Sequence, residues 1–228
     1  MSVGLVLVSH SAKLAEGLAE VAGQMAPDVR IVPAGGIEDG GIGTDFDQVV
    51  AAVQRADSGA GVVLLYDLGS AQMTAELAVE SLADPEAVVV ADAPFVEGTV
   101  AAAVAAQGGA DRAAVLAAAA AAGAPHLAAP AATGGADVDS IELVLHNEVG
   151  LHARPAALLA RSLAGIQADV SVVLGEQEAD AHSVLALMSL GARKGDRIEI
   201  RARGAQAGQA LATVRDLVAR NFDEPGDV

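Results

Sequence analysis

The sequence contains no cysteine, and only 2% of its residues are aromatic. Without cysteine the chain can form neither disulfide bonds nor thiolate metal sites, and it has no cysteine nucleophile. Because aromatic side chains are scarce, the core has to be built from Ala, Val, Leu and Ile. Hydrophobic residues still make up 53% of the 228 residues, which is enough material for a folded core.

Basic residues are also few, since 13 Lys and Arg stand against 30 Asp and Glu and leave a net charge of −17. A chain this acidic does not bind nucleic acid through its overall field. Neither of its two lysines, Lys13 and Lys194, belongs to a P-loop motif. An ATP-dependent kinase that acts alone is therefore disfavoured.

Long hydrophobic runs are missing as well. The apolar run after Met1 is short and has no basic region before it, so it matches neither a signal peptide nor a membrane span. The alanine tract at 113–122 is only weakly lipophilic, and charged residues precede it. We expect a cytoplasmic protein.

The charge is divided unevenly along the chain, which indicates two domains. Residues 1–137 hold 4 basic and 17 acidic residues, a balance of −13, whereas 138–228 hold 9 and 13, a balance of −4. The segment between them is rich in Ala, Pro and Gly and lacks hydrophobic periodicity, which is typical of a linker. We expect a domain at 1–124, a linker at 125–138 and a second domain at 139–228.

The first domain alternates short apolar strands with helices. Continuous apolar strands separated by amphipathic helices indicate a parallel sheet with helices on both faces, a doubly wound α/β fold. Strands are predicted at 3–9, 30–33, 61–66 and 87–91, and helices at 14–25, 46–56, 71–82 and from 99 to 107.

The second domain has a different pattern, in which the strands alternate apolar and polar residues. The order βαββαβα predicts an α+β open-faced sandwich with helices on one face of one sheet. Strands are predicted at 141–147, 169–175 and 197–203, a turn with a possible short strand at 176–180, and helices at 154–165, 183–191 and 207–222.

A histidine follows the first strand of the first domain. His10 stands between Ser9 and Ser11, where the carboxyl end of a parallel strand meets the start of a helix. Asp67 follows the strand at 61–66 and should reach the same edge of the sheet. Its carboxylate could hold one imidazole nitrogen of His10 and fix the tautomer.

The surroundings expected at this edge suit an anion. Gly69 and Ser70 open the next helix and could offer donors, while the glycine-rich loop at 34–45 permits close approach of backbone. A metal site is disfavoured because these loops offer no second well-placed histidine. The alternative interpretation is that His10 merely ends a strand and that the glycines serve turns.

A second histidine directly precedes a helix of the second domain. His152 is followed by Arg154 and by Pro155, which is favoured in the first turn of a helix. The N–H groups of that turn and the guanidinium of Arg154 suit a phosphate. A neutral imidazole nitrogen can attack phosphorus and carry the group as an N–P bond without a cofactor. The alternative is a helix-capping histidine beside a surface arginine.

Residues 140–224, with NEVGLHARPAALLA at their start, resemble HPr, the histidine phosphocarrier of the phosphoenolpyruvate-dependent phosphotransferase system. The resemblance implies that His152 is the phosphorylated histidine and that Arg154 binds phosphate. Ser183 lies where some HPr proteins carry a regulatory serine, although a helix N-cap is its more ordinary role. His126 and His146 match no motif and are predicted to lie in the linker and in a strand.

Residues 1–123 resemble the mannose-type IIA domain of the same system, and more closely the version in the DhaM family of dihydroxyacetone kinase subunits. The matching phrases are LVLVSHS, AGGIEDGGIGTD, YDLGSAQ and ADAPFVEGTVAA. The phosphorylated histidine of this family maps to His10. Fusion of a IIA domain to HPr in one chain is itself typical of the DhaM family.

These resemblances imply a phosphoryl relay. Enzyme I, phosphorylated from phosphoenolpyruvate, would phosphorylate His152, and His152 would pass the group to His10 across the flexible linker. His10 would then rephosphorylate ADP held in the DhaL subunit, for transfer to dihydroxyacetone bound by DhaK. The sequence ends at Val228 without an enzyme I-like segment, so a separate enzyme I is expected. A homodimer is also expected, because related IIA domains are dimeric, and neither metal nor cofactor is expected.

Two other functions remain open. One is the IIA component of a mannose-type sugar transporter, which would use the same histidines; the phrases GIGTD and VEGTVAA favour the DhaM family. The other is a non-enzymatic regulator whose phosphorylation state signals to a partner. A phosphohistidine mutase or phosphatase is weaker still, since His10 lacks the adjacent arginine of an RHG motif.

Overall fold

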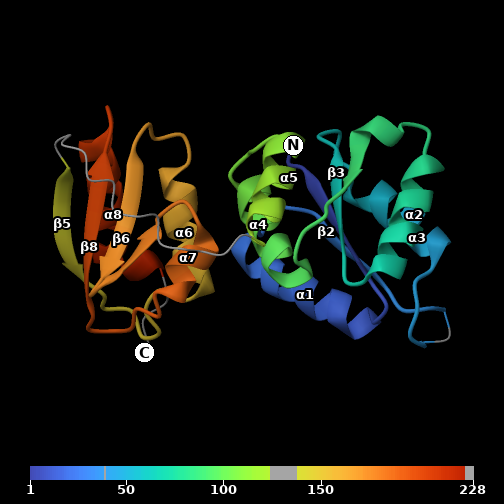
Figure 1. Cartoon of the computed structure of the whole chain (residues 1–228), viewed down its shortest axis with the longest axis horizontal. Helices are drawn as coiled ribbons and strands as arrows, with labels where there is room; N and C mark the ends of the chain where they lie inside the picture. The colour runs from blue at the N-terminus through green and yellow to red at the C-terminus, as the bar shows by residue number, and fades with distance from the viewer. Residues whose placement is uncertain (39, 124–137, 224–228) are drawn as a thin grey trace. The chain divides into compact units, whose positions relative to one another are not determined.

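The computed structural model describes residues 1–38, 40–123 and 138–223 (Figure 1). The chain divides into two compact units, Met1–Ala124 and Pro125–Val228, and each has its own sheet and its own core. The predicted linker lies almost wholly outside the described residues, and so does His126.

The first unit is built on a four-stranded parallel sheet with the strand order β2-β1-β3-β4. In the described part of this unit, five helices and one short 3₁₀ turn connect and cover these strands. The strands are β1 (Gly4–Ser9), β2 (Ile31–Gly35), β3 (Val62–Tyr66) and β4 (Val88–Val90), and the helices are α1 (Ala12–Met25), α2 (Phe46–Ala56), α3 (Gly69–Glu80), η1 (Pro85–Ala87), α4 (Phe95–Gln107) and α5 (Arg112–Ala121).

Both faces of this sheet are buried, which confirms the doubly wound α/β fold. Side chains alternate between faces along a strand, so Leu5 and Leu7 of β1 join the core under α1, α4 and α5. Val6 and Val8 of the same strand join the core under α2 and α3. Figure 1 shows α4 and α5 on one side of the strands and α2 and α3 on the other.

Local sequence sets where the helices of the first unit begin, and α1, α2 and α5 are each capped by a side chain. The hydroxyl of Ser11 accepts a hydrogen bond from the N–H of Leu14, so α1 begins at Ala12, two residues before the predicted start. Helix α4 begins at Phe95, directly after Pro94, rather than at residue 99. The alanine tract forms a separate helix, α5, which Asp111 caps.

The second unit has a four-stranded antiparallel sheet with the order β5-β8-β6-β7. The chain order confirms the predicted βαββαβα arrangement, and the possible short strand near 176–180 is present as β7. Its elements are β5 (Asp139–Val144), α6 (Ala153–Leu163), β6 (Asp169–Leu174), β7 (Gln177–Asp180), α7 (Val184–Ser189), β8 (Arg197–Arg203), α8 (Ala207–Ala219) and η2 (Asn221–Asp223).

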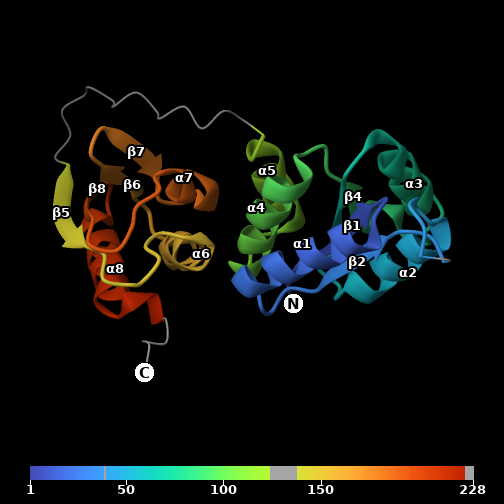
Figure 2. The same ribbon diagram turned by 90° about the horizontal axis from the view of Figure 1, so that it is seen from below.

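Helices cover one face of this sheet (Figure 2). On β8, Ile198 and Ile200 are fully buried, whereas the alternate residues Arg197, Glu199 and Arg201 are not. This alternation is expected of an antiparallel sheet with one solvated face, and it confirms the open-faced sandwich.

The prediction that His146 lies in a strand is wrong. Strand β5 ends at Val144, because its partner β8 begins only at Arg197. Beyond that point the backbone of Leu145 bonds to Gly195 and Asp196, in the loop that precedes β8. The chain then turns at residues 147–149.

Within the described ranges, no helix combines the length and the apolar character that crossing a membrane requires.

The separate cores predict that the two units unfold independently. Leu65 is fully buried in the first unit, and its replacement by Ala should destabilise that unit by about 2–5 kcal/mol. Tyr66 is the single tyrosine of a chain without tryptophan, so tyrosine fluorescence during urea unfolding reports on the first unit alone. Leu65→Ala should lower the midpoint of that transition.

The matched control is Ile198→Ala, which removes a fully buried side chain from the second unit. It should leave the tyrosine transition unchanged while lowering the midpoint of a far-ultraviolet circular dichroism phase. A shift of the tyrosine transition in Ile198→Ala would mean that the two units unfold together.

Candidate functional site

His10 lies at the carboxyl end of β1, where the parallel sheet brings the ends of two strands together. The register pairs Val8 of β1 with Tyr66 of β3, and the N–H of Asp67 bonds to the carbonyl of Val8 at 3.2 Å. Asp67 therefore reaches the imidazole that follows the neighbouring strand.

The carboxylate of Asp67 holds His10 at two points. One oxygen, Oδ1, lies 2.9 Å from the Nδ1 atom of His10, and Oδ2 accepts the backbone N–H of His10 at 2.9 Å. The hydroxyl of the fully buried Ser9 donates to Oδ2 at 2.8 Å and accepts the N–H of Ser11 at 3.1 Å. Because an ionised carboxylate can only accept hydrogen bonds, Nδ1 of a neutral His10 carries the proton and Nε2 keeps its lone pair.

Two opposing effects set the pKa of Asp67. Burial of the carboxyl group would raise the pKa, but hydrogen bonds from the backbone and side chain of His10 and from Ser9 favour the charged form. The net result is a pKa below the ordinary range of an aspartate. Asp67 therefore stays ionised where the imidazole needs an acceptor.

Ser70 contacts the other imidazole nitrogen from the first turn of α3. Its hydroxyl lies 2.7 Å from Nε2 of His10, and the lone pair on Nε2 makes Ser70 the donor. The His10 side chain keeps 21% of its surface exposed, so an incoming group can reach it. Gly69 begins α3, and a Cβ atom there would meet open space, so packing does not require glycine at this position.

The glycine-rich loop between β2 and α2 is tied to the backbone of the same histidine. The N–H of Gly36 bonds to the carbonyl of Ser9 at 3.2 Å, and the N–H of Gly43 bonds to the carbonyl of His10 at 2.9 Å. A Cβ atom on Gly35 would lie 2.7 Å from the carbonyl oxygen of Ser11, so only glycine permits this approach. The loop thus packs closely against the start of α1.

Sequence reasoning missed one contact in this loop. The hydroxyls of Thr44 and Thr74 lie 2.9 Å apart and connect the loop to α3. The phrase GIGTD contains Thr44, but nothing in the sequence pairs it with a threonine in the next helix.

His152 is the N-cap residue of α6, with its carbonyl accepting the N–H of Ala156 at 3.0 Å. Its imidazole makes no capping hydrogen bond to α6, so the interpretation of this side chain as a helix cap is not supported. Pro155 is buried in the first turn, and Arg154 is exposed beside it. His152 therefore stands at the N-terminal, positive end of α6.

The loop before His152 has a fixed backbone. Gly150 has φ +75°, and a Cβ atom there would lie 2.1 Å from the carbonyl oxygen of Ala192. That carbonyl accepts the N–H of Leu151 at 2.9 Å, and the amide of the buried Asn147 donates to the carbonyl of Gly150 at 2.8 Å. Asn147 was not singled out from the sequence, where it is only the last residue of a predicted strand at 141–147.

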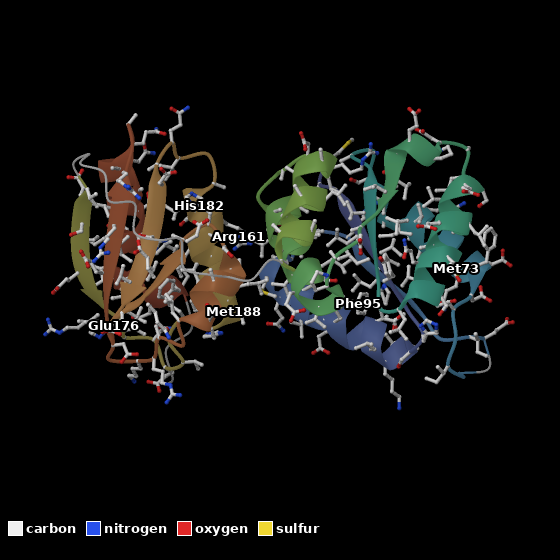
Figure 3. The ribbon with its side chains drawn as sticks, in the orientation of Figure 1. Met73, Phe95, Arg161, Glu176, His182 and Met188 are labelled. Atoms are coloured by element: carbon white, nitrogen blue, oxygen red, sulfur yellow. The ribbon has the colours of Figure 1, made fainter. Side chains whose placement is uncertain are left out.

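Ser183 caps α7, because its hydroxyl accepts the N–H of Ala186 at 3.2 Å, and this confirms the capping role. The preceding residue, His182 (Figure 3), pairs with Asp180 through Nδ1 at 3.1 Å. That hydrogen bond raises the pKa of His182 and lowers the pKa of Asp180.

Comparison with known proteins matches each of the two units to a protein family. The model of the IIA-man family, described as the fructose IIA component of the phosphotransferase system, matches residues 4–116. The model described as the phosphorylation site of the HPr component of that system matches residues 140–220. The matched segments contain His10 and His152, respectively.

Three curated relatives are phosphoryl donor subunits, named DhaM, of PEP-dependent dihydroxyacetone kinases. The protein of Klebsiella michiganensis is 37% identical over 245 aligned positions, which cover 98% of this chain and 51% of the relative. That of Escherichia coli is 34% identical, covering 99% and 52%. A shorter one from Listeria innocua is 42% identical over 104 positions, covering 46% and 82%. The chain thus spans about half the length of the first two relatives.

The lowered pKa of Asp67 predicts a pH-dependent contribution to stability. A carboxyl whose pKa is lower in the folded state stabilises above its unfolded pKa, and this stability is lost as the pH falls through the folded value. At pH 7, Asp67→Asn should lower the free energy of unfolding by about 2 kcal/mol, since charged hydrogen bonds are removed. The difference from wild type should shrink below pH 4, near the ordinary pKa of about 3.9.

Urea unfolding followed by tyrosine fluorescence between pH 3 and pH 8 checks this prediction. Asp47→Asn, at an exposed position in the first turn of α2, is the control and should change stability little across the range. A stability difference for Asp67→Asn that stays constant with pH would contradict the role of the charged carboxylate.

Proposed function

Since this chain belongs to the DhaM family, the phosphoryl donor subunits of phosphoenolpyruvate-dependent dihydroxyacetone kinases, we propose that it relays phosphoryl groups through His152 and His10. The observation that carries the proposal is the imidazole of His10, whose Nδ1 is held by Asp67 at 2.9 Å while Nε2 faces the hydroxyl of Ser70. This arrangement fixes the tautomer of the imidazole, so that the unprotonated Nε2 is the nitrogen that can attack an electrophile.

The first transfer brings a phosphoryl group to His152. A lone pair on its imidazole forms a new N–P bond while the N–P bond to the donor histidine of enzyme I breaks. The electron pair of that bond returns to the donor imidazole. N–H groups of the first turn of α6 and the exposed guanidinium of Arg154 would stabilise the charge on the phosphoryl oxygens.

In the second transfer, Nε2 of His10 attacks the phosphorus atom carried by His152. The bond from His152 to phosphorus breaks, and its electron pair stays on the imidazole of His152. The proton on Nδ1 of His10 remains in place, so the phosphorylated ring is positively charged. The ionised carboxylate of Asp67, 2.9 Å away, stabilises that charge.

Ser70 changes its partner during this step. Before transfer its hydroxyl donates to Nε2 of His10 at 2.7 Å. Once Nε2 is bonded to phosphorus, the same hydroxyl can donate to a phosphoryl oxygen, as can N–H groups at the start of α3. The site therefore supplies donors without a metal or a cofactor.

The later steps and the partners are proposed on the strength of the family resemblance. His10 would phosphorylate ADP bound in a DhaL subunit, and the ATP formed there would serve dihydroxyacetone bound by DhaK. Enzyme I would be the donor, with the chain acting as a homodimer in the cytoplasm. The relatives support this assignment over a sugar transporter, because all three are named as kinase subunits.

Reconstitution tests the order of the relay. With enzyme I and phosphoenolpyruvate, His10→Ala should become phosphorylated on His152 and should fail to support dihydroxyacetone phosphate formation by added DhaK, DhaL and ADP. His152→Ala should leave His10 unphosphorylated. Peptide mass spectrometry at neutral or alkaline pH, where phosphohistidine survives, locates the group.

Mixing the two variants is the informative control. Recovery of activity in the mixture would show transfer between chains, whereas its absence would show transfer within one chain. Full activity of either single variant would overturn the relay, and turnover of dihydroxyacetone with ATP in the absence of DhaK and DhaL would overturn the partner assignment.

A second prediction concerns Arg154. Removal of its guanidinium in Arg154→Ala should slow phosphorylation of His152 by enzyme I about tenfold or more, because one charged donor to the phosphoryl group is lost. Arg215→Ala, an exposed arginine on α8, is the matched control and should keep the wild-type rate. Rapid-quench kinetics measures both, and equal rates for the two variants would exclude Arg154 from phosphate binding.

A further inference from the structure

Two threonines outside the expected site residues form a hydrogen-bonded bridge beside His10. Thr44 belongs to the glycine-rich loop before α2, and Thr74 lies in α3, next to the exposed Met73 (Figure 3). Their hydroxyl oxygens are 2.9 Å apart. The bridge joins two segments that are 30 positions apart in the sequence.

The direction of this bridge follows from the number of protons. The hydroxyl of Thr74 donates to the carbonyl of Ser70, one helical turn earlier, at 3.2 Å. A hydroxyl has one proton, so Thr74 has none left for Thr44. Thr44 is therefore the donor, and the chain of bonds runs from Thr44 through Thr74 to the carbonyl of Ser70.

This chain ends at the residue that contacts the reactive nitrogen. The hydroxyl of Ser70 lies 2.7 Å from Nε2 of His10. The first turn of α3, which carries Ser70, has no side-chain cap, because Leu68 stands at the N-cap position. The neighbouring N–H of Gly43 is bonded to the carbonyl of His10 at 2.9 Å. The loop is thus fixed to His10 on one side and to the Ser70 turn on the other.

We propose that Thr44 and Thr74 are positioning residues. They hold the hydroxyl of Ser70 within hydrogen-bonding distance of Nε2 of His10 and fix the glycine-rich loop beside that site. The inference deepens the proposed function and rests on it. Neither hydroxyl is needed to satisfy a buried group, since both side chains are only partly buried and a helical threonine can bond to its own helix alone. The bridge instead fixes the position of the groups around Nε2 of His10. Small displacements of groups around a reacting atom can lower its rate of reaction by up to about 100-fold.

The test measures the appearance of phosphate on each histidine after rapid mixing with phosphorylated enzyme I. Thr44→Val and Thr74→Val keep the side-chain shape and remove the hydroxyl. In both variants His152 should be phosphorylated at the wild-type rate, while phospho-His10 should form roughly tenfold more slowly. The double variant should be no slower than the slower single variant, because both changes break one bridge.

Matched variants separate positioning from a general effect of losing a threonine. Thr44→Ser and Thr74→Ser retain the hydroxyl and should restore the wild-type rate. Thr213→Val removes the same type of bond, in which the hydroxyl donates to the Gln209 carbonyl at 2.9 Å on α8, and should have no effect. The urea midpoint of the tyrosine transition checks that the valine variants remain folded at the assay temperature.

Nitrogen-15 NMR measures the chemical shifts of the two imidazole nitrogens of His10, which would not change if the threonines only stabilised the fold. The Nε2 signal of His10 in Thr44→Val and Thr74→Val should shift toward that of Ser70→Ala, because the donor to Nε2 is misplaced. The Nδ1 signal should stay near its wild-type position, since Asp67 still holds that atom.

Wild-type rates in both valine variants would overturn this inference, as would slow transfer with an unchanged Nε2 signal or without rescue by serine. These results differ from a failure of the relay itself. If wild-type chain never forms phospho-His10, the proposed function is wrong; if wild type forms it and the valine variants match wild type, only the role of the threonine bridge is wrong.

Discussion

The geometry of the first site depends on the hydrogen bond between Asp67 and His10. This carboxylate is largely buried, yet it accepts bonds from the His10 backbone, the His10 imidazole and the Ser9 hydroxyl, which keep its pKa low. Without an ionised acceptor at Nδ1, a neutral imidazole would distribute its proton over both nitrogens. The parallel pairing of β1 with β3 is what brings the two residues together.

Different groups surround the two histidines. The imidazole of His10 is oriented by the carboxylate of Asp67. Around His152 the backbone is fixed by the start of α6 and by the left-handed turn at Gly150, which fits against Ala192. We infer that a phosphoryl group on His10 gains an adjacent negative charge that stabilises the imidazolium ring, while on His152 it gains N–H donors that stabilise its oxygens.

Much of this arrangement could be predicted from the sequence because it follows from short-range patterns and one topological rule. Apolar runs predict parallel strands, and the carboxyl ends of parallel strands meet at one edge of the sheet, which predicts that Asp67 lies near His10. The Thr44–Thr74 bridge could not be predicted, because it depends on the path of an irregular loop that no periodicity encodes. The error at His146 has a similar origin: β5 ends where its partner β8 begins, a constraint set by a segment about 50 residues away.

The scarcity of large side chains bears on the site as well as on the core. Helix α3 packs on the sheet through Ala71, Ala75 and Ala78, which are all fully buried. The distance between packed elements grows with the size of the side chains between them. Larger residues on this face would lift α3 from the sheet and would carry Ser70 away from Nε2, now 2.7 Å from its hydroxyl. The alanine-rich composition is therefore part of what keeps the hydroxyl of Ser70, on α3, within hydrogen-bonding distance of the histidine that follows β1.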